Sequence, residues 1–170
     1  MQDKKKDASE EGATPLKDKV DQVLIEARVV LPGALALLGF QFTIILMEAF
    51  DKLPLSSKYV HLASLALIAL CTILLMAPAA YHRIAESGEV SAHFERLASR
   101  LVLASMVPLA LGICGDFFVV LRKVSGSVEF SIISSAIMLA IFYGLWFGYS
   151  LLQRKREHQR RASKAEFDPT

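Results

Sequence analysis

Four ionisable residues lie within or beside long apolar runs of this sequence, where a charged group is costly and is therefore a functional candidate. Glu48 ends the first run and His61 opens the second, whereas Asp116 lies late in the third and Glu129 opens the fourth. If each run crosses a membrane once, all four lie at a similar depth near one surface. Carboxylate and imidazole groups there can bind a divalent cation or relay protons. These residues are the predicted outer polar cluster.

The same four residues also have a structural interpretation, which the sequence favours. Each lies within about two helical turns of the expected surface, so its side chain can reach water or hydrogen-bond to a neighbouring helix. Glu48 shares a predicted helical face with Gln41, the polar residue that lies deeper in the first run. No HxxxH or CxxC spacing is present, so no metal site is predicted.

Familiar catalytic and cofactor patterns are missing from the sequence. There is no GxSxG, Walker A or HExxH motif. His61 and His82 lie about 31 Å apart along one helix, which is too far for them to ligate a single haem. Cys71 and Cys114 differ in depth by roughly 8 Å, which a disulfide does not span, so both are predicted to be free and buried. We therefore expect a non-enzymatic protein with no catalytic residue and no cofactor.

Four apolar runs are long enough to cross a bilayer, which takes about 20 residues. They cover residues 32–50, 59–80, 101–121 and 130–152. Hydrophobic residues make up 54% of the 170 residues, too large a share for a soluble domain of this size to bury. Backbone groups in lipid must be hydrogen-bonded within their own segment, which favours helices. The sequence predicts an all-α membrane protein whose 32–153 domain is a four-transmembrane-helix antiparallel bundle.

Three further segments flank this domain. Residues 1–15 are charged and predicted to be a disordered tail. Residues 16–31 alternate apolar and polar side chains at helical spacing, which predicts an amphipathic helix lying in the membrane interface. Pro32 is expected to kink the chain or to begin a new helix. Residues 154–170 form a predicted basic cytoplasmic tail.

The positive charges predict the orientation in the membrane. Fifteen of the 19 lysines and arginines fall on the side of the two termini, and four fall on the other side. The positive-inside rule therefore places both termini in the cytoplasm and the chain in a cell inner membrane as a multi-pass protein. The net charge is only +2, and the basic run 153–161 directly follows an apolar helix. The expected partners are the lipid bilayer and anionic lipid headgroups, not nucleic acid.

Small residues mark the expected helix contacts, because helices in lipid associate through close packing. Ala140, Gly144 and Gly148 recur at four-residue steps in the fourth run, and Gly112 lies in the third. These positions are predicted to be packing seams, either within the bundle or against a partner. That partner is a second copy of the chain or another membrane protein.

A second polar group is expected at the cytoplasmic end, the predicted cytoplasmic cluster. It comprises Glu26, Arg28, His82 and Arg83, which enter the membrane from the same side. Ion pairs of Glu26 with Arg83 and of Arg28 with Glu95 would clamp the N-terminal helix to the loop after the second run. Such a clamp is favoured over a substrate site, because surface charges of both signs are usual there.

Two segments near this end carry a resemblance. The first, "LIEARVVLPGALALLGFQF", contains the pattern E-x-R-V-x-x-P-G, and the second, "LLMAPAAYHR", ends in A-P-A-A-Y-H-R. Over residues 18–150 the chain resembles a family of small bacterial four-helix integral membrane proteins of unknown function. The resemblance implies the same topology and a bacterial inner-membrane location, and it implies no activity, substrate or cofactor.

Two functions from different classes fit these observations. The first is a non-catalytic scaffold, assembly or accessory subunit, and the second is a small proton- or cation-conducting transporter or channel that uses Glu48, His61 and Asp116. The first is favoured because few polar groups lie in the middle of the predicted bundle, and transporters usually place a broken helix or a charge there. Pro108 is the best feature in favour of transport, because it frees a backbone carbonyl within the third run.

Overall fold

The computed structural model describes residues 3–85 and 91–148, and these ranges are helical with no strand. The long helices are α1 (Asp3–Ile45), α3 (Leu55–Ala85), α4 (Ala92–Ser125) and α5 (Val128–Tyr143). The short helix α2 (Glu48–Asp51) links α1 to α3, and a π-helical turn, η1 (Gly144–Gly148), extends α5. The predicted all-helical class is confirmed.

Four helical stretches of the described chain are long and apolar enough to cross a membrane. They are Leu16–Ile45, Leu55–Ile84, Ala92–Ser125 and Val128–Trp146. Many of their large apolar side chains point away from the protein, including Phe40, Ile73 and Ile133. Exposed apolar surface on this scale is typical of contact with lipid. The stretches overlap all four predicted runs, but the first stretch ends at Ile45 and not at residue 50, and residues 149–152 of the last run lie outside the described residues.

Helix α1 differs from the sequence expectation at both of its ends. It begins at Asp3, where a disordered tail was predicted, and it continues through Pro32 without a break. Lysine, glutamate and alanine in its first turns are good helix formers. A proline within a membrane helix is tolerated when surrounding groups satisfy the freed carbonyl. The predicted division into a tail, an interfacial helix and a first span is therefore one continuous helix.

The C-terminal end of α1 corrects the predicted placement of Glu48. The helix ends at Ile45, and its last turn is tightened by bonds from Leu46 N to Thr43 O and from Met47 N to Ile44 O, both of 3.1 Å. Met47 is extended, and Glu48 then begins the separate helix α2. The helical face that Glu48 was predicted to share with Gln41 is interrupted by this turn.

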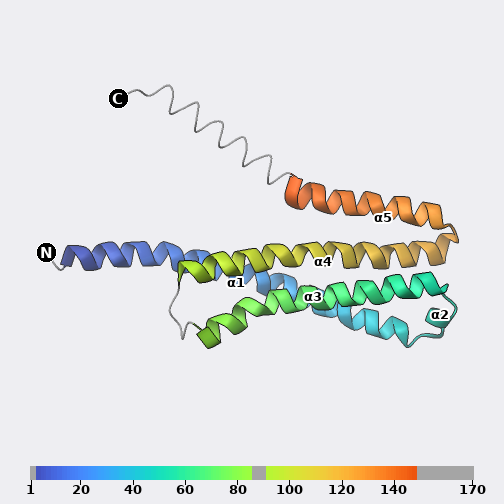
Figure 1. Ribbon diagram of the computed structural model, residues 1–170, viewed down its shortest axis with the longest axis horizontal. Helices are drawn as coiled ribbons and strands as arrows, with labels where there is room; N and C mark the ends of the chain where they lie inside the picture. Colours follow the sequence, from blue (N-terminus) through green and yellow to red (C-terminus); the bar gives the residue numbers. More distant parts are fainter. Residues whose placement is uncertain (1–2, 86–90, 149–170) are drawn as a thin grey trace, which may run out of the picture.

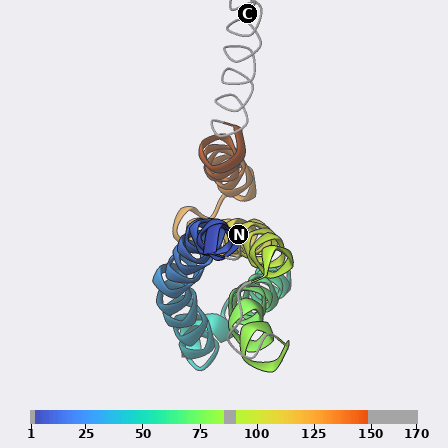
Figure 2. The ribbon, with the colours of Figure 1, turned by 90° about the vertical axis from the view of Figure 1, so that its left-hand side faces the viewer.

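The core lies among α1, α3 and α4, which surround it when viewed from the end (Figures 1 and 2). Its buried residues include Ala34 from α1, Ile68 and Leu75 from α3, and Leu109 from α4. Helices α3 and α4 pack most closely, because α4 presents glycines where α3 approaches. A side-chain carbon added to Gly112 would lie 2.6 Å from the Ile68 side chain.

Helix α5 lies on the outer side of α4, away from α1 and α3 (Figure 2). Ser131 is its buried residue. Trp146 of η1 reaches back and packs against the core. The fourth helix was predicted to complete the bundle, but α5 instead leaves most of its surface free. The predicted basic tail, 154–170, lies outside the described residues.

The turn between α4 and α5 is defined by local capping. Gly126 ends α4 in the left-handed region with φ 70°, and its N–H donates to the Arg122 carbonyl at 3.1 Å. Ser127 caps the next helix, because its hydroxyl accepts a bond from Phe130 N at 3.3 Å. Capping on both sides makes the connection short and fixes where α5 leaves α4.

Candidate functional site

A buried polar cluster joins the three core helices near the ends linked by α2. It consists of Gln41 from α1, His61 from α3 and Asp116 from α4, named here the Gln41–His61–Asp116 cluster. The imidazole Nδ1 of His61 lies 3.0 Å from Asp116 Oδ1, and its Nε2 lies 3.1 Å from the Gln41 backbone carbonyl. The Gln41 side-chain amide donates to the other oxygen of Asp116. Each residue therefore contacts the other two.

The partners of His61 restrict where its protons lie. A backbone carbonyl oxygen only accepts, so Nε2 carries a proton and donates it to Gln41. A second proton then lies between Nδ1 and Asp116, either as an imidazolium–carboxylate pair or as a neutral imidazole that accepts from a protonated carboxyl. The His61–Asp116 pair has no net charge in either form. A neutral pair of this kind suits a low-dielectric position.

The cluster is closed toward α2 by an aromatic ring. His61 and Gln41 are each 2% exposed, and the Asp116 side chain is 24% exposed. Phe50 of α2 contacts the His61 ring edge-to-face with centroids 5.4 Å apart, and the Lys58 ammonium lies 5.7 Å from the centre of the Phe50 ring. Asp116 is thus the member of the cluster that retains access from outside.

One acceptor in the cluster has no partner. Gln41 Oε1 is buried without a hydrogen bond to the described protein. A buried amide oxygen left unpaired costs about 1–3 kcal/mol, so a donor from outside the described chain would stabilise it. Water or a small cation has the chemistry to fill this role.

Two members of the predicted outer polar cluster lie outside this site. Glu48 on α2 and Glu129 at the start of α5 are both exposed, and among the described residues neither makes a hydrogen bond or ion pair with His61 or Asp116. No group of three His, Cys, Asp or Glu residues in the described chain is arranged to hold a metal ion. Gln41 was not included in the predicted outer polar cluster, because the sequence placed it deeper in the first run than Glu48. The sequence feature that could have identified Gln41 is a single amide side chain within an otherwise apolar run.

The interior beyond the cluster becomes apolar toward the other end. The hydroxyls of Thr72 and Ser105 donate to carbonyls of their own helices, Ala69 and Val102, each at 2.7 Å. The surrounding buried side chains are Ile68, Leu75, Val102 and Leu109. The described interior beyond the cluster is therefore mainly apolar, and its buried polar side chains include Ser64, Thr72 and Ser105.

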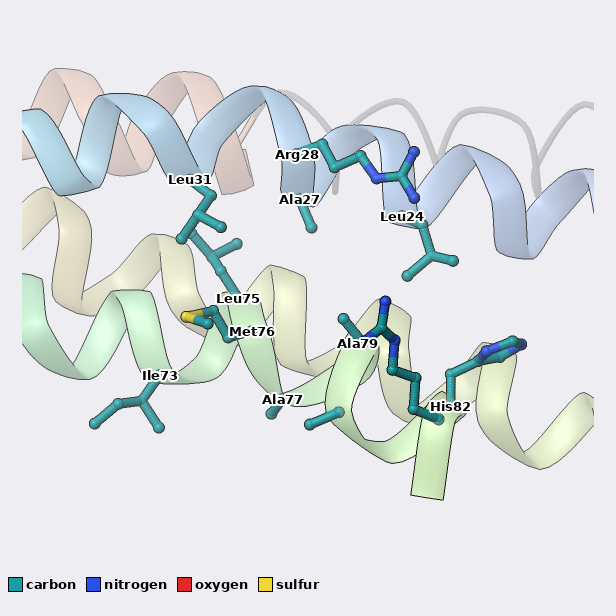
Figure 3. A pocket seen from close by; sticks show the side chains of 12 residues that line it. Leu24, Ala27, Arg28, Leu31, Ile73, Leu75, Met76, Ala77, Ala79 and His82 are labelled. Atoms are coloured by element: carbon teal, nitrogen blue, oxygen red, sulfur yellow. The ribbon is translucent and has the colours of Figure 1, made fainter. Parts of the chain in front are cut away.

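The predicted cytoplasmic cluster forms in part, because three of its four residues line one groove and Glu26 does not. Glu26, Arg28 and Arg83 are exposed, and the His82 ring contacts Phe94 of α4 with centroids 5.2 Å apart. Neither predicted ion pair, Glu26 with Arg83 or Arg28 with Glu95, forms among the described residues, where the one ion pair is His61 with Asp116. Arg28, His82 and Arg83 instead line an apolar groove between α1 and α3 (Figure 3).

The predicted packing residues fall into two groups. Gly112 is buried against α3, as described above. Ala140 and Gly144 are exposed and Gly148 is half-buried, and a side-chain carbon added to Gly144 meets nothing within 4 Å. In the described part of the chain, Ala140 and Gly144 of this stripe are therefore open to the surroundings. Cys71 and Cys114 are free and buried, as predicted.

The fold and the buried cluster define an α-helical, multi-pass membrane protein. The chain belongs to the family of unknown function DUF6328, whose family model matches residues 10–150. This agrees with the expected resemblance to a family of unknown function and assigns no activity. Neither a curated protein nor a solved structure matches the chain.

Proposed function

We propose that this protein is a non-catalytic membrane subunit that assembles with other membrane helices through α5. The observation that carries the proposal is the position of α5. Only 6% of its apolar stretch is buried, whereas 44% of the apolar stretch of α4 is buried. A core of α1, α3 and α4 already packs without it, so α5 is free to pair with a partner.

The composition of the free face supports a protein partner for α5 in addition to lipid. Ala140, Gly144 and Gly148 share this face, and glycine costs a helix about 1 kcal/mol relative to alanine. Glycines at four-residue steps allow two helix backbones to approach closely, which repays that cost. The partner is a second copy of the chain or another membrane protein.

The proposal is tested by replacing Gly144 and Gly148 together with leucine. Leucine is the better helix former, so α5 itself is retained while the close approach is blocked. We expect the assembled form to be lost in light scattering of detergent-solubilised protein and in cross-linking within native membranes. Gly39→Leu is the matched control, because a side chain there also meets nothing within 4 Å but lies on α1. Unchanged assembly of the α5 variant would refute the proposal.

The second candidate function is transport of protons or cations, and the Gln41–His61–Asp116 cluster favours it. The cluster places a shared proton and an unpaired amide oxygen in the apolar interior. Ionisable groups inside a membrane commonly mark ion pathways. The apolar core beyond the cluster argues against a permanently open path, so transport would require a second conformation.

The transport candidate is tested in proteoliposomes that contain a pH-sensitive dye. An imposed proton or cation gradient should collapse faster with the wild-type protein than with Asp116→Asn. Glu48→Gln is the control, because Glu48 is exposed on α2 and lies outside the cluster. Equal rates for the wild type and Asp116→Asn would exclude this function.

The proposed orientation places both termini in the cytoplasm and the chain in a bacterial inner membrane. Support comes from the lysines and arginines, fifteen of which lie on the side of the termini. Cysteine labelling at Lys58 and Arg96 from the two sides of intact cells tests it. The proposal requires Lys58→Cys to react from outside and Arg96→Cys to react only after the membrane is opened.

A further inference from the structure

An open groove of about 820 Å³ lies between α1 and α3, toward the ends opposite the Gln41–His61–Asp116 cluster (Figure 3). Its walls are apolar, with Leu24 and Leu31 contributed by α1 and Met76 and Ala79 by α3. This volume lies within the range of about 300–1,000 Å³ that small-molecule sites occupy. The groove opens between helices that the chain presents to the bilayer, so lipid has direct access to it.

Two arginines line the groove from opposite sides. Arg28 belongs to α1 and Arg83 to the last turn of α3. Side chains of a helix lean toward its N-terminus. Helices α1 and α3 run in opposite directions (Figure 1), so Arg28 leans toward the end of the groove and Arg83 leans back into it. Figure 3 shows the Arg28 guanidinium directed along the groove above Ala79 and His82.

The charge of the groove has one sign. None of its described lining residues is acidic, and neither Arg28 nor Arg83 makes an ion pair with a described carboxylate. Arginine matches phosphate through parallel N–H donors, and basic pockets between membrane helices bind anionic lipid headgroups. An apolar groove that ends at two arginines therefore complements an amphiphile with an anionic head and an apolar chain.

We propose that this groove, named here the α1–α3 groove, binds one anionic phospholipid. One acyl chain lies along Leu31 and Met76, and the phosphate is held by Arg28 and Arg83. The site is independent of the partner face on α5, so either proposal can fail without the other.

The proposal is tested by native mass spectrometry of the full-length protein titrated with phosphatidylglycerol in detergent. We expect one phosphatidylglycerol to bind in preference to phosphatidylcholine. The variant Arg28→Gln/Arg83→Gln should weaken its binding about 25-fold, which corresponds to about 1 kcal/mol for each arginine. Ala79→Trp, which fills the groove and keeps both arginines, should also weaken binding.

The matched control is Arg96→Gln/Arg100→Gln, which removes the same charge from exposed positions on α4 that do not line the groove. This control should bind phosphatidylglycerol as the wild type does. Equal weakening by the control would reveal general charge attraction and overturn the proposal. Displacement of the lipid by millimolar inorganic phosphate, together with no effect of Ala79→Trp, would assign the arginines to a free anion and also overturn it. If the Arg28/Arg83 variant does not fold, the effect of Ala79→Trp on phosphatidylglycerol binding tests the proposal by itself.

Discussion

His61 and Asp116 face each other across the contact between α3 and α4, with Nδ1 and Oδ1 3.0 Å apart. They are 55 positions apart in the sequence, and Gln41 of α1 completes the group. One polar cluster therefore connects all three core helices at the end where α1 and α3 are linked. Interhelical hydrogen bonds in a membrane protein contribute modestly to stability, about 0.6 kcal/mol on average, but they fix the orientation of the helices.

The first prediction concerns the stability of this cluster. His61→Phe removes one of the two hydrogen-bond partners of Asp116, whose other partner is the Gln41 amide, and it leaves the Gln41 backbone carbonyl without its imidazole donor. We expect it to lower the free energy of unfolding by about 1–3 kcal/mol, measured by denaturation in mixed micelles. Adding Asp116→Leu to His61→Phe should recover part of the loss, because both polar partners are then gone. Glu48→Gln should leave the free energy of unfolding unchanged. If the losses caused by His61→Phe and Asp116→Leu simply add in the double variant, the two side chains do not interact.

The second prediction concerns the protons of His61. Its Nε2 faces a backbone carbonyl, which only accepts, so Nε2 should carry a proton and donate it to that carbonyl. Nitrogen-15 NMR of histidine-labelled protein in lipid measures this directly. Asp116→Asn should change the Nδ1 signal while Nε2 remains protonated. A neutral tautomer with its proton on Nδ1 and a bare Nε2 would contradict the described geometry.

The third prediction concerns the close approach of α3 and α4. A methyl group at Gly115 would overlap the Ser64 hydroxyl, so Gly115→Ala should destabilise the protein by about 1–3 kcal/mol. Ser64→Ala in the same chain should restore stability, because it removes the overlapping oxygen. Gly39→Ala is the control, since it meets nothing within 4 Å and should be neutral or stabilising. Thermal unfolding in detergent ranks the variants, and a harmless Gly115→Ala would mean that the helices do not approach so closely.

The fourth prediction concerns the turn that directs α5. Gly126 has φ 70°, a conformation that costs a residue with a side chain about 1–2 kcal/mol. Gly126→Ala should therefore lower the unfolding temperature, and Gly126→Asn should lower it less because asparagine tolerates this conformation better. Equal effects of the two substitutions would indicate that the position is open but not strained.

Much of the Gln41–His61–Asp116 cluster could be predicted from the sequence. Counting residues from the ends of the apolar runs placed His61 and Asp116 at one depth, and the described structure joins them. The same count included Glu48 in the group and placed Gln41 deeper in the membrane. It failed there because α1 ends at Ile45, and the end of a helix depends on local turn bonds that hydropathy does not report.

The partners of the helices were not predictable in the same way. Gly112 and Gly144 look alike in the sequence, yet Gly112 is buried against α3 and Gly144 is exposed. Arg28 and Arg83 were expected to pair with carboxylates, and they line an apolar groove instead. Small residues indicate that a second helix can approach closely, but they do not indicate which helix does so.

The sequence by itself determined that this is a helical membrane protein with four segments long and apolar enough to cross a bilayer. Run length and backbone hydrogen bonding in lipid are properties of each segment alone, so no knowledge of neighbours is needed. Only the tertiary structure decided that α1, α3 and α4 form the core, that α5 lies outside it and that His61 meets Asp116. Helices in lipid gain little from burying apolar surface against each other, so shape and a few polar contacts select their partners. Those contacts depend on the rotation and crossing of whole helices, which no single segment encodes.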